Sequence, residues 1–421
     1  MALDHIRIIP LVMLIILLPL PTYADETISW QECVERAQNH NPDLHIAREL
    51  VIRSAADLKI TRSEALPDVR GEMAYERSDS SSGGERDTYS AGISARQMIF
   101  DGFRTSNEVS AARASEDSAR YRYKIISSDV RLKLRTAFVE LLRAQELLKI
   151  TGEIVSRREQ NAELVRLRYE AGREHRGSLL TAEANLAQSE FDSEQARRKV
   201  ALSRRSLSLV IGRDISDGVV AEGALQLISM PDVSVDISTL ADMHPVVNEL
   251  AALRVTAMFQ ARAAKGDYYP SLYLNARIGV SDETWPPEED EWSAGLQLSY
   301  PFYEGGARSA RVLRADALAR QTEAEMKSGR NEIIEKLDTA KADLNEAMSF
   351  VKVQRKFLEA SRERANIARA QYGSGLISFD TWTIIEDEIA RKEVSYLEAL
   401  YNAHLAAAEW VHSKGGTLED E

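Results

Sequence analysis

The chain has 421 residues, a formal net charge of −13 and a single cysteine, Cys33. The acidic charge argues against broad binding of nucleic acid, because such binding depends on lysine and arginine neutralising phosphates. One cysteine excludes an intrachain disulfide, and the length allows two or three ordinary domains or one extended domain.

The N-terminus is typical of a secretory signal peptide. An apolar run follows Arg7, and Thr22-Tyr23-Ala24, with small residues at its first and third positions, then offers a cleavage site before Asp25. The run is short and interrupted by prolines, which disfavours the alternative of an uncleaved membrane anchor. Cys33 does not follow the predicted cleavage site, so a lipid-modified N-terminal cysteine is not supported. We therefore predict that residues 1–24 are removed.

The mature sequence is a tandem duplication with an offset of 203 residues. Two strand-to-helix junctions, QMIFDGFRTSNEV from Gln97 and YPFYEGGARSARV from Tyr300, share the order apolar run, acidic residue, glycine and polar helix start. The same offset relates two pairs of prolines, the segments RYEAG and QYGSG, and an apolar stripe in each half. A fixed offset over most of the chain predicts a repeated structure.

Each half has the same predicted plan. We expect a first repeat over 25–212, a linker over 213–231, a second repeat over 232–414 and a short tail over 415–421. In each repeat a helix of about 35 residues ends before a proline, two strands follow, and a very long helix and a returning helix complete the unit. The first repeat has predicted helices at 30–65, 102–169 and 178–212 and strands at 68–77 and 89–99. The second has predicted helices at 239–268, 305–372 and 379–413 and strands at 271–280 and 292–302.

The predicted strands alternate between apolar and polar residues. Alternation over about ten residues, with aromatic residues near the ends, suits a tilted strand between lipid and water. The apolar set that we expect to face lipid includes Leu272, Leu274, Leu296 and Leu298. The alternative is a half-buried hairpin of a soluble protein. The polar set counts against it, since it carries the charged residues Arg70, Glu72, Glu76 and Arg96.

Four strands are too few for a closed barrel, since roughly eight is the practical minimum. Open sheet edges cannot persist in lipid, where each unpaired backbone group costs several kcal/mol. The strands must therefore be pooled between chains. The long helices have apolar residues at coiled-coil spacing and would reach on the order of 100 Å at about 1.5 Å per residue. A soluble bundle or filament-like coiled coil is the alternative for the helices, but it leaves the hairpins unexplained.

The whole arrangement resembles the TolC family of outer-membrane efflux proteins. The matching features are the junctions IFDGFR and FYEGGAR, the strands that follow prolines, and the turns RYEAG and QYGSG. The resemblance implies a homotrimer in which four strands from each chain build a transmembrane β-barrel of about twelve. It also implies that the long coiled-coil helices continue this barrel as an α-helical tunnel across the periplasm.

The resemblance further implies function and partners. The protein would be a passive exit duct in the outer membrane of a tripartite efflux pump or a type I secretion system. It would contact outer-membrane lipid, a periplasmic adaptor (membrane fusion protein) and an inner-membrane transporter. A secreted or periplasmic coiled-coil scaffold or adaptor without a channel is the alternative function.

The resemblance places the two turns at the periplasmic tip, where adaptor hairpins engage. The docking residues are then Tyr169, Gly172, Tyr372 and Gly375. We expect both glycines to end their helices in the left-handed conformation. The tyrosines, one helical turn earlier, either present their rings at the mouth of the tunnel or pack inside the helical hairpin.

The tip also has a candidate constriction. Many relatives narrow it with two aspartates on the returning helix, and the corresponding positions here hold Thr381 and Ile384. Asp380 is the nearest carboxylate and is our candidate for lining the constriction. The tail is short, so any belt that it forms around the helices should be small.

No group of residues predicts catalysis. The seven histidines form no H-E-x-x-H pattern, and the single cysteine has no partner thiol. The segments GGAR and SSSGGE lack the Lys-Ser/Thr ending of a phosphate-binding loop. We therefore predict no enzyme activity, no metal site and no cofactor.

Overall fold

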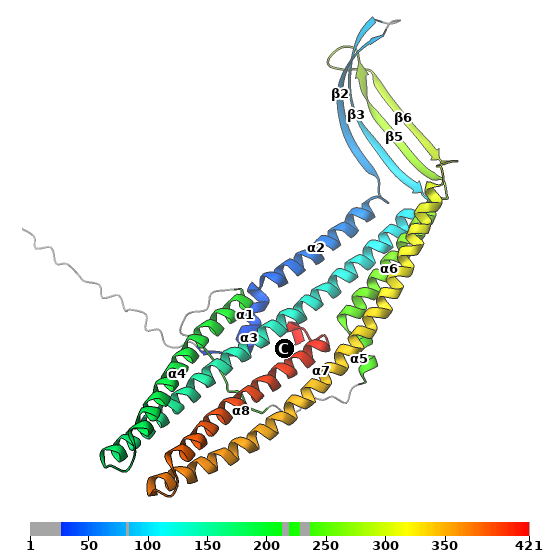
Figure 1. The fold of residues 1–421 in the computed structure, drawn as a ribbon. Helices are drawn as coiled ribbons and strands as arrows, with labels where there is room; N and C mark the ends of the chain where they lie inside the picture. The colour runs from blue at the N-terminus through cyan, green and yellow to red at the C-terminus, as the bar shows by residue number, and fades with distance from the viewer. Residues whose placement is uncertain (1–26, 81–83, 213–218, 228–235, 421) are drawn as a thin grey trace, which may run out of the picture.

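The computed structural model describes residues 27–80, 84–212, 219–227 and 236–420. Figure 1 shows an elongated body of helices that carries a curved β-sheet at one end. The predicted signal peptide, 1–24, and parts of the predicted linker, 213–231, lie outside the described residues. Inside them, no helix combines the length and the apolar character that a helical membrane span needs.

Both halves of the chain contain the same main elements in the same order. The first half comprises α1 (Trp30–His40), α2 (Pro42–Ser63), β2 (Asp68–Ser80), β3 (Gly84–Phe100), α3 (Arg104–Glu170) and α4 (Arg176–Ile211). The second half comprises α5 (Ile237–Met243), α6 (Pro245–Gly266), β5 (Ser271–Asp282), β6 (Asp290–Ser299), α7 (Ala307–Ser374) and α8 (Phe379–Ser413). Two short parallel strands, β1 (Thr27–Ile28) and β4 (Val220–Ala221), and a 3-10 turn, η1 (Leu418–Asp420), are added to this plan.

The expected single helices over 30–65 and 239–268 are wrong, because each is broken by a proline. Asn41 and His244 take extended backbone conformations, and the following proline begins a new helix. The residue before a proline avoids the helical region, and proline suits the first helical position because its missing N–H is not needed there. The side chains of Asn41 and His244 cap the new helices by accepting from Leu44 N and Val246 N, each at 3.2 Å.

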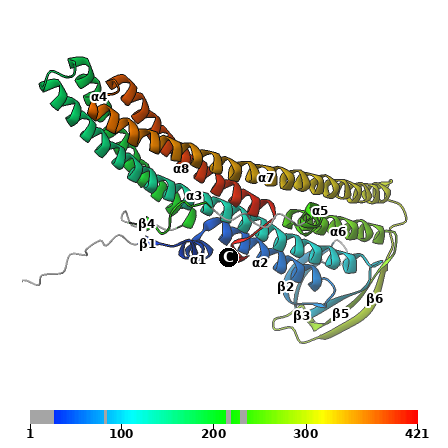
Figure 2. The same ribbon diagram turned by 90° about the horizontal axis from the view of Figure 1, so that it is seen from below.

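The short helices stack end to end beside the two long ones. α3 and α7 run unbroken for 67 and 68 residues. α4 ends against the start of α2, where Asn41 Nδ2 donates to the carbonyl of Val210 at 2.6 Å. α8 is followed by Gly415, where a β-carbon would overlap the ring of Pro245 at the start of α6. Neighbouring helices therefore run in the order α2–α3–α6–α7 near the sheet and α4–α3–α8–α7 towards the far end (Figures 1 and 2).

The apolar stripes of the long helices lie in the core. Buried members include Val130, Leu134 and Leu141 on α3 and Ile333, Leu337, Leu344 and Val351 on α7. They pack against the shorter helices in two clusters along the body, and a third cluster fills the tip around Trp382. The end of the chain is tied to this core, since Leu418 is buried and Glu419 accepts from Tyr123 Oη at 2.7 Å.

The four long strands form one antiparallel sheet in the order β2-β3-β5-β6. The two predicted hairpins thus share a sheet through the pairing of β3 with β5. In the described part of the chain, β2 and β6 each keep one edge without a partner strand. β6 ends at Ser299, short of the expected 302, because Pro301 has no N–H to donate to a strand ladder.

Candidate functional site

The strand register puts the predicted lipid-facing residues on one face. Leu272 pairs with Leu298, and Leu274 pairs with Leu296. The same face continues across the other strands with exposed apolar side chains: Val69, Met73, Tyr75, Ile93, Ile278 and Trp292. Leu296 keeps 69% of its surface exposed, whereas Leu272 is half-buried. We call this set of residues the apolar sheet face.

The opposite side of the sheet is charged. Arg70 pairs with Asp68 at 2.6 Å, and Arg277 lies 3.4 Å from Glu291. The guanidinium of Arg96 lies 4.1 Å from the centre of a tyrosine ring on the neighbouring strand. A sheet with one exposed apolar face and one charged face is suited to a wall between lipid and water.

Two glycines let the sheet curl towards its charged side. Gly92 on β3 pairs with Gly279 on β5. A β-carbon at Gly92 would lie 2.9 Å from the carbonyl oxygen of Ile278, and one at Gly279 would lie 2.5 Å from that of Ala91. The backbones approach too closely for side chains there, which is how glycine permits sharp curvature in a sheet. Because both glycines belong to the charged side of the register, we infer that the sheet curves towards that side.

Aromatic side chains gather where the sheet meets the helices. The exposed ones are Phe103, Tyr268, Tyr269, Tyr300, Phe302 and Tyr303, which we call the aromatic collar. Arg308 lies with its guanidinium 5.6 Å from the ring centres of both Tyr268 and Tyr300. Aromatic residues concentrate in this way at membrane–water interfaces, where one end of the ring is apolar and the other is wet.

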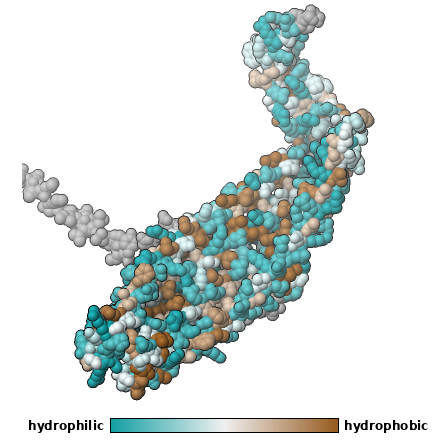
Figure 3. Space-filling model, viewed as in Figure 1, coloured by the Kyte–Doolittle hydropathy of each residue, from teal (hydrophilic) through white to brown (hydrophobic). Residues whose placement is uncertain are grey.

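The helices at the two edges of the body expose large apolar side chains. These are Ile46, Ile52 and Ile60 on α2, Phe191, Leu202 and Leu209 on α4, and Leu313, Phe350, Val353 and Phe357 on α7. Figure 3 shows apolar patches along the helical body on the face in view. Exposed apolar patches on a protein surface mark candidate sites of association.

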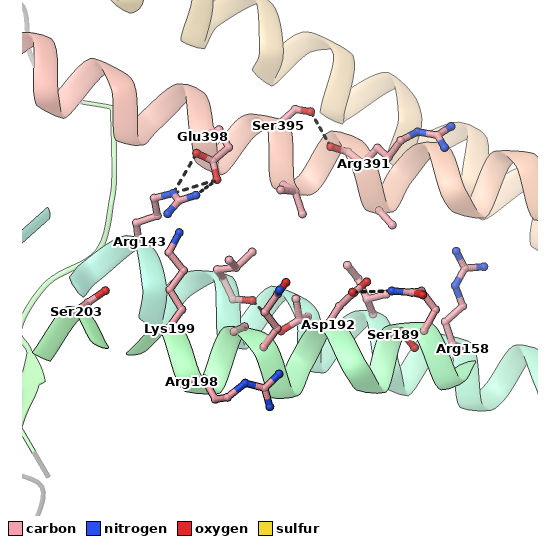
Figure 4. A pocket seen from close by; sticks show the side chains of 18 of the residues that line it. Arg143, Arg158, Ser189, Asp192, Arg198, Lys199, Ser203, Arg391, Ser395 and Glu398 are labelled. Carbon is pink, nitrogen blue, oxygen red and sulfur yellow. Dashed lines mark hydrogen bonds and ion pairs between the residues drawn. The ribbon is translucent and has the colours of Figure 1, made fainter. Parts of the chain in front are cut away.

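A groove runs between α4 and α8, with α3 as its floor. Its cavity has a volume of about 1190 Å³, and charged residues of both signs line it (Figure 4). On one side of this groove Arg143 of α3 pairs with Glu398 of α8 at 2.5 Å. Further along, Arg157 of α3 pairs with the buried Glu393 of α8, also at 2.5 Å. Loss of one partner would leave a partly desolvated charge, so these pairs hold α3 to α8.

At the far end of the body, the two turns have the predicted backbone geometry. Gly172 has a φ of +69° and Gly375 a φ of +79°. Glycine adopts this left-handed conformation without a steric penalty. After Gly375, the N–H of Leu376 donates to the carbonyl of Gln371 at 2.8 Å, which satisfies the end of α7. The two glycines therefore reverse the chain at matching places.

Of the two arrangements expected for Tyr372, packing inside the helical hairpin is the one observed, and the arrangement with its ring at the mouth is wrong. Tyr372 is 1% exposed, and its ring stacks on Trp382 with centres 4.2 Å apart. Its hydroxyl donates to Glu174 at 3.0 Å, while Arg168 donates to its backbone carbonyl at 2.7 Å. The ring of Tyr372 is more stable inside the tip than at the mouth, because Trp382 provides an apolar face to stack on and Glu174 provides the acceptor that a buried hydroxyl needs.

The environment of this contact favours a charged Glu174 and a neutral Tyr372. Partial burial opposes ionisation of Glu174, but hydrogen bonds from Ser178 and Tyr372 hold its pKa below the ordinary value. Burial, together with the hydrogen bond to Glu174, raises the pKa of the Tyr372 phenol above its ordinary value. The contact is therefore a charge-assisted hydrogen bond at neutral pH.

The other predicted tip residues lie on the surface. Tyr169 is 39% exposed, and Asp380 is exposed in the first turn of α8. The carboxylate of Asp380 has no hydrogen bond or ion pair with any described residue. The roles of Arg168, Glu174 and Trp382 were not predicted from the sequence. Their only signal was position, because Arg168 begins the RYEAG segment, Glu174 follows it, and Trp382 follows the QYGSG turn.

No group of metal-ligating side chains occurs within the described ranges.

A family model described as outer membrane efflux protein matches residues 33–213 and 237–412. The outer membrane efflux protein BepC of Brucella suis is 22% identical over 339 residues, which cover 80% of this chain and 72% of that protein. The protein CyaE of Bordetella pertussis is 25% identical over 373 residues, which cover 85% of this chain and 78% of that protein.

Solved structures share the fold. The open state of the Neisseria gonorrhoeae MtrE outer membrane channel has a TM-score of 0.84 at 18% identity, covering 93% of this chain and 90% of that one. The Campylobacter jejuni CmeC outer membrane channel has a TM-score of 0.82 at 15% identity, covering 93% of this chain and 86% of that one. These likenesses extend over both the sheet and the helical body.

Proposed function

The chain belongs to the outer membrane efflux protein family, and from that premise we propose that three copies assemble into one duct from the periplasm to the cell exterior. Membership makes it a channel protein of efflux or secretion rather than an enzyme. Its place is the outer membrane, with the helical body extending into the periplasm. The number of copies, the closed barrel and the partners belong to the proposal.

The unpaired edges of the sheet are the observation that carries this proposal. Among the described residues, β2 has a free edge on one side of the sheet and β6 on the other. Each unpaired backbone group costs several kcal/mol in lipid, so a stable form in a membrane must pair these edges. Pairing β6 of one copy with β2 of the next is a head-to-tail contact, and repeated head-to-tail contacts close a ring when the rotation permits. Three copies supply about twelve strands, which is enough for a channel.

The helical edges support the same ring. α2 adjoins β2 along the chain and α7 adjoins β6. The exposed apolar residues of α2 and α4 therefore lie on one edge of the protomer, and those of α7 lie on the other (Figure 1). A neighbour placed to pair β6 with β2 brings α7 against α2 and α4 as well. One assembly then covers both the strand edges and the apolar helix surfaces.

In this duct the apolar sheet face contacts lipid and the concave charged side faces water. Leu272, Leu274, Leu296 and Leu298 belong to the lipid-facing wall. The aromatic collar marks the periplasmic boundary of the membrane. A coiled-coil scaffold without a channel has no use for an exposed apolar sheet, which disfavours that alternative.

The far end of the helical body is then the periplasmic tip that docks a periplasmic adaptor and, through it, an inner-membrane transporter. Gly172 and Gly375 shape the turns, and Tyr169 is the aromatic side chain available to a partner. Tyr372 supports the docking surface from inside. Asp380 is the candidate for lining the constriction, since it is exposed on the first turn of α8.

Membrane fractionation combined with conductance tests the proposed function. The protein should sediment with the outer membrane and survive mild detergent extraction as a trimer. Inserted into planar bilayers, that trimer should open water-filled channels. Recovery as a soluble periplasmic protein, or a purified trimer that never conducts, would contradict the proposal.

A further inference from the structure

The two repeats differ in charge where the end of the short helix meets the start of the long one. In the second repeat Lys265 of α6 and Asp316 of α7 form an ion pair at 3.0 Å. The equivalent residues of the first repeat, 203 positions earlier, are Arg62 of α2 and Arg113 of α3. Both arginines are exposed, and neither guanidinium has a hydrogen-bond or ion-pair partner among the described residues. The first repeat thus has two positive charges at the positions where the second repeat has an ion pair.

Arg62 and Arg113 line one open cavity of about 450 Å³ at the foot of the sheet. Its apolar wall consists of Met98, Ile99, Phe100, Phe103 and Val109. Asp101 carries the one carboxylate among the residues that line this cavity, and it already has hydrogen-bond partners within the protomer. Asp101 accepts from the backbone N and the Oγ1 of Thr105 at 2.8 and 2.6 Å, and it lies 3.8 Å from the guanidinium of Arg104. The cavity therefore offers unpaired cationic groups beside an apolar surface.

Phe103, in the wall of this cavity, adopts a backbone conformation that disfavours a side chain. Its φ is +65°, the only positive φ at a residue other than glycine in the described chain. The second repeat has Gly306 at the equivalent position, with a φ of +87°. Phe103 is 67% exposed, and its ring packs edge-on against Phe100 at 5.6 Å. The backbone of Phe103 is strained, yet its ring gains little burial within the protomer. This combination points to a contact of the ring outside the protomer.

We propose that this cavity binds an anionic phospholipid of the periplasmic leaflet, with its phosphate held by Arg62 and Arg113 and its apolar part resting on Phe103 and Ile99. The inference rests on the proposed insertion of the sheet in the outer membrane. The aromatic collar then sets the cavity at the level of the headgroups. Guanidinium groups match phosphate oxygens in geometry and charge, and basic pockets at this depth select anionic headgroups. A free phosphate ion would satisfy the arginines but leave the apolar wall uncovered.

Lipid titration of the purified full-length trimer in mild detergent, read by native mass spectrometry, tests the proposal. The probes are phosphatidylglycerol, phosphatidylethanolamine and inorganic phosphate. The wild type should retain phosphatidylglycerol in preference to phosphatidylethanolamine, and inorganic phosphate should not displace it. The double variant R62Q/R113Q should bind phosphatidylglycerol at least about tenfold more weakly, because both charge-assisted contacts are lost.

Two further variants keep the test specific. R53Q/R205Q removes the same charge from exposed arginines of α2 and α4 outside the cavity, and it should bind like the wild type. F103G introduces the residue of the second repeat, so it should weaken lipid binding without lowering the melting temperature, since glycine suits this backbone.

Three results would overturn the inference. The double variant could retain phosphatidylglycerol like the wild type, or inorganic phosphate could displace the lipid, which would make the site a simple anion site. The double variant could also lose the trimer while the control keeps it, which would place a second copy in the cavity. Failure of the proposed function would be seen separately, as absence of the wild type from the outer-membrane fraction.

Discussion

Tyr372 donates a hydrogen bond of 3.0 Å to Glu174 and so joins the two turns at the tip. The two residues belong to different repeats and lie 198 positions apart in the chain. Tyr372 follows most of α7, whereas Glu174 stands between α3 and α4. One side chain therefore sets the relative position of the two helical hairpins where a partner would dock.

The variant Y372F tests this link, because it keeps the ring and removes only the hydroxyl. A hydrogen bond to a charged group contributes about 1.5–3 kcal/mol. Amide hydrogen exchange in both turns should therefore accelerate by about tenfold or more, with exchange in the helical body unchanged. Y169F is the matched control, since the ring of Tyr169 is exposed and its hydroxyl makes no hydrogen bond with the described residues. Equal exchange in the two variants would show that the hydrogen bond does not hold the two turns together.

A buried histidine predicts a pH dependence of stability. Burial, aided by Lys336 and His412, lowers the pKa of His244 from 6.5 to about 4. Between pH 4 and pH 6.5, His244 therefore binds a proton in the unfolded chain but stays neutral in the folded chain. The free energy of unfolding should be highest above pH 6.5 and fall by up to about 3 kcal/mol as the pH drops towards 4.

The variant H244N isolates this effect. Asn41 caps the equivalent helix of the first repeat, so asparagine should keep the cap of α6 while removing the ionisable group. Urea unfolding at a series of pH values should show a shallower dependence between 6.5 and 4 for H244N than for the wild type. H45N, which changes an exposed histidine of α2, serves as the control. A slope that H244N leaves unchanged would exclude His244 as its source.

The lipid-facing wall predicts opposite outcomes for two neighbouring residues of β6. Leu296 lies on the apolar sheet face, and Gln297 lies on the charged side, where it accepts from Asn275. An arginine on the lipid face costs about 2–4 kcal/mol near mid-membrane. L296R should therefore reduce the trimer recovered from outer membranes far more than Q297R. Equal tolerance of both changes would reverse or abolish the assigned faces.

The candidate constriction predicts a change in conductance. If Asp380 lines the narrow part of the tip, the variant D380A should enlarge it, remove charge, and raise the leak conductance of the trimer in planar bilayers. D57A, which changes an exposed aspartate in the part of α2 that approaches the sheet, far from the tip, is the control. A conductance equal to the wild type would exclude Asp380 from the constriction.

The sequence predicted the family, the function and the location correctly, because these rest on the order of junctions and turns over the whole chain. It also predicted the faces of the strands, because alternation depends only on neighbours in the chain. The breaks at Asn41 and His244 were missed, although each precedes a proline. The helical pattern continues on both sides of each break, so periodicity alone does not detect it.

The burial of Tyr372 was not predictable in the same way. Tyr169 and Tyr372 occupy equivalent places before their glycines, yet one is exposed and the other is buried. The difference depends on Trp382 and Glu174, which only the folded tip brings to Tyr372. Likewise, Arg62 and Arg113 are two ordinary surface arginines in the sequence. Their shared cavity becomes visible only when α2 is packed beside α3.

Cross-linking of β2 to β6 tests the shared barrel most directly. In a variant with Cys33 replaced by serine, single cysteines would be placed on the apolar sheet face, at Val69 or Met73 in β2 and at Leu296 or Leu298 in β6. Within one chain these strands are separated by β3 and β5. That separation is about 14 Å at roughly 4.8 Å per strand, too far for a disulfide.

If the barrel is shared, oxidation of outer membranes should give a covalent trimer on a denaturing gel for at least one of the four pairs. Each single-cysteine variant should stay monomeric there. If no pair forms cross-links although all the cysteines remain reactive to a small thiol reagent, the strands of neighbouring copies do not meet and the shared barrel is wrong.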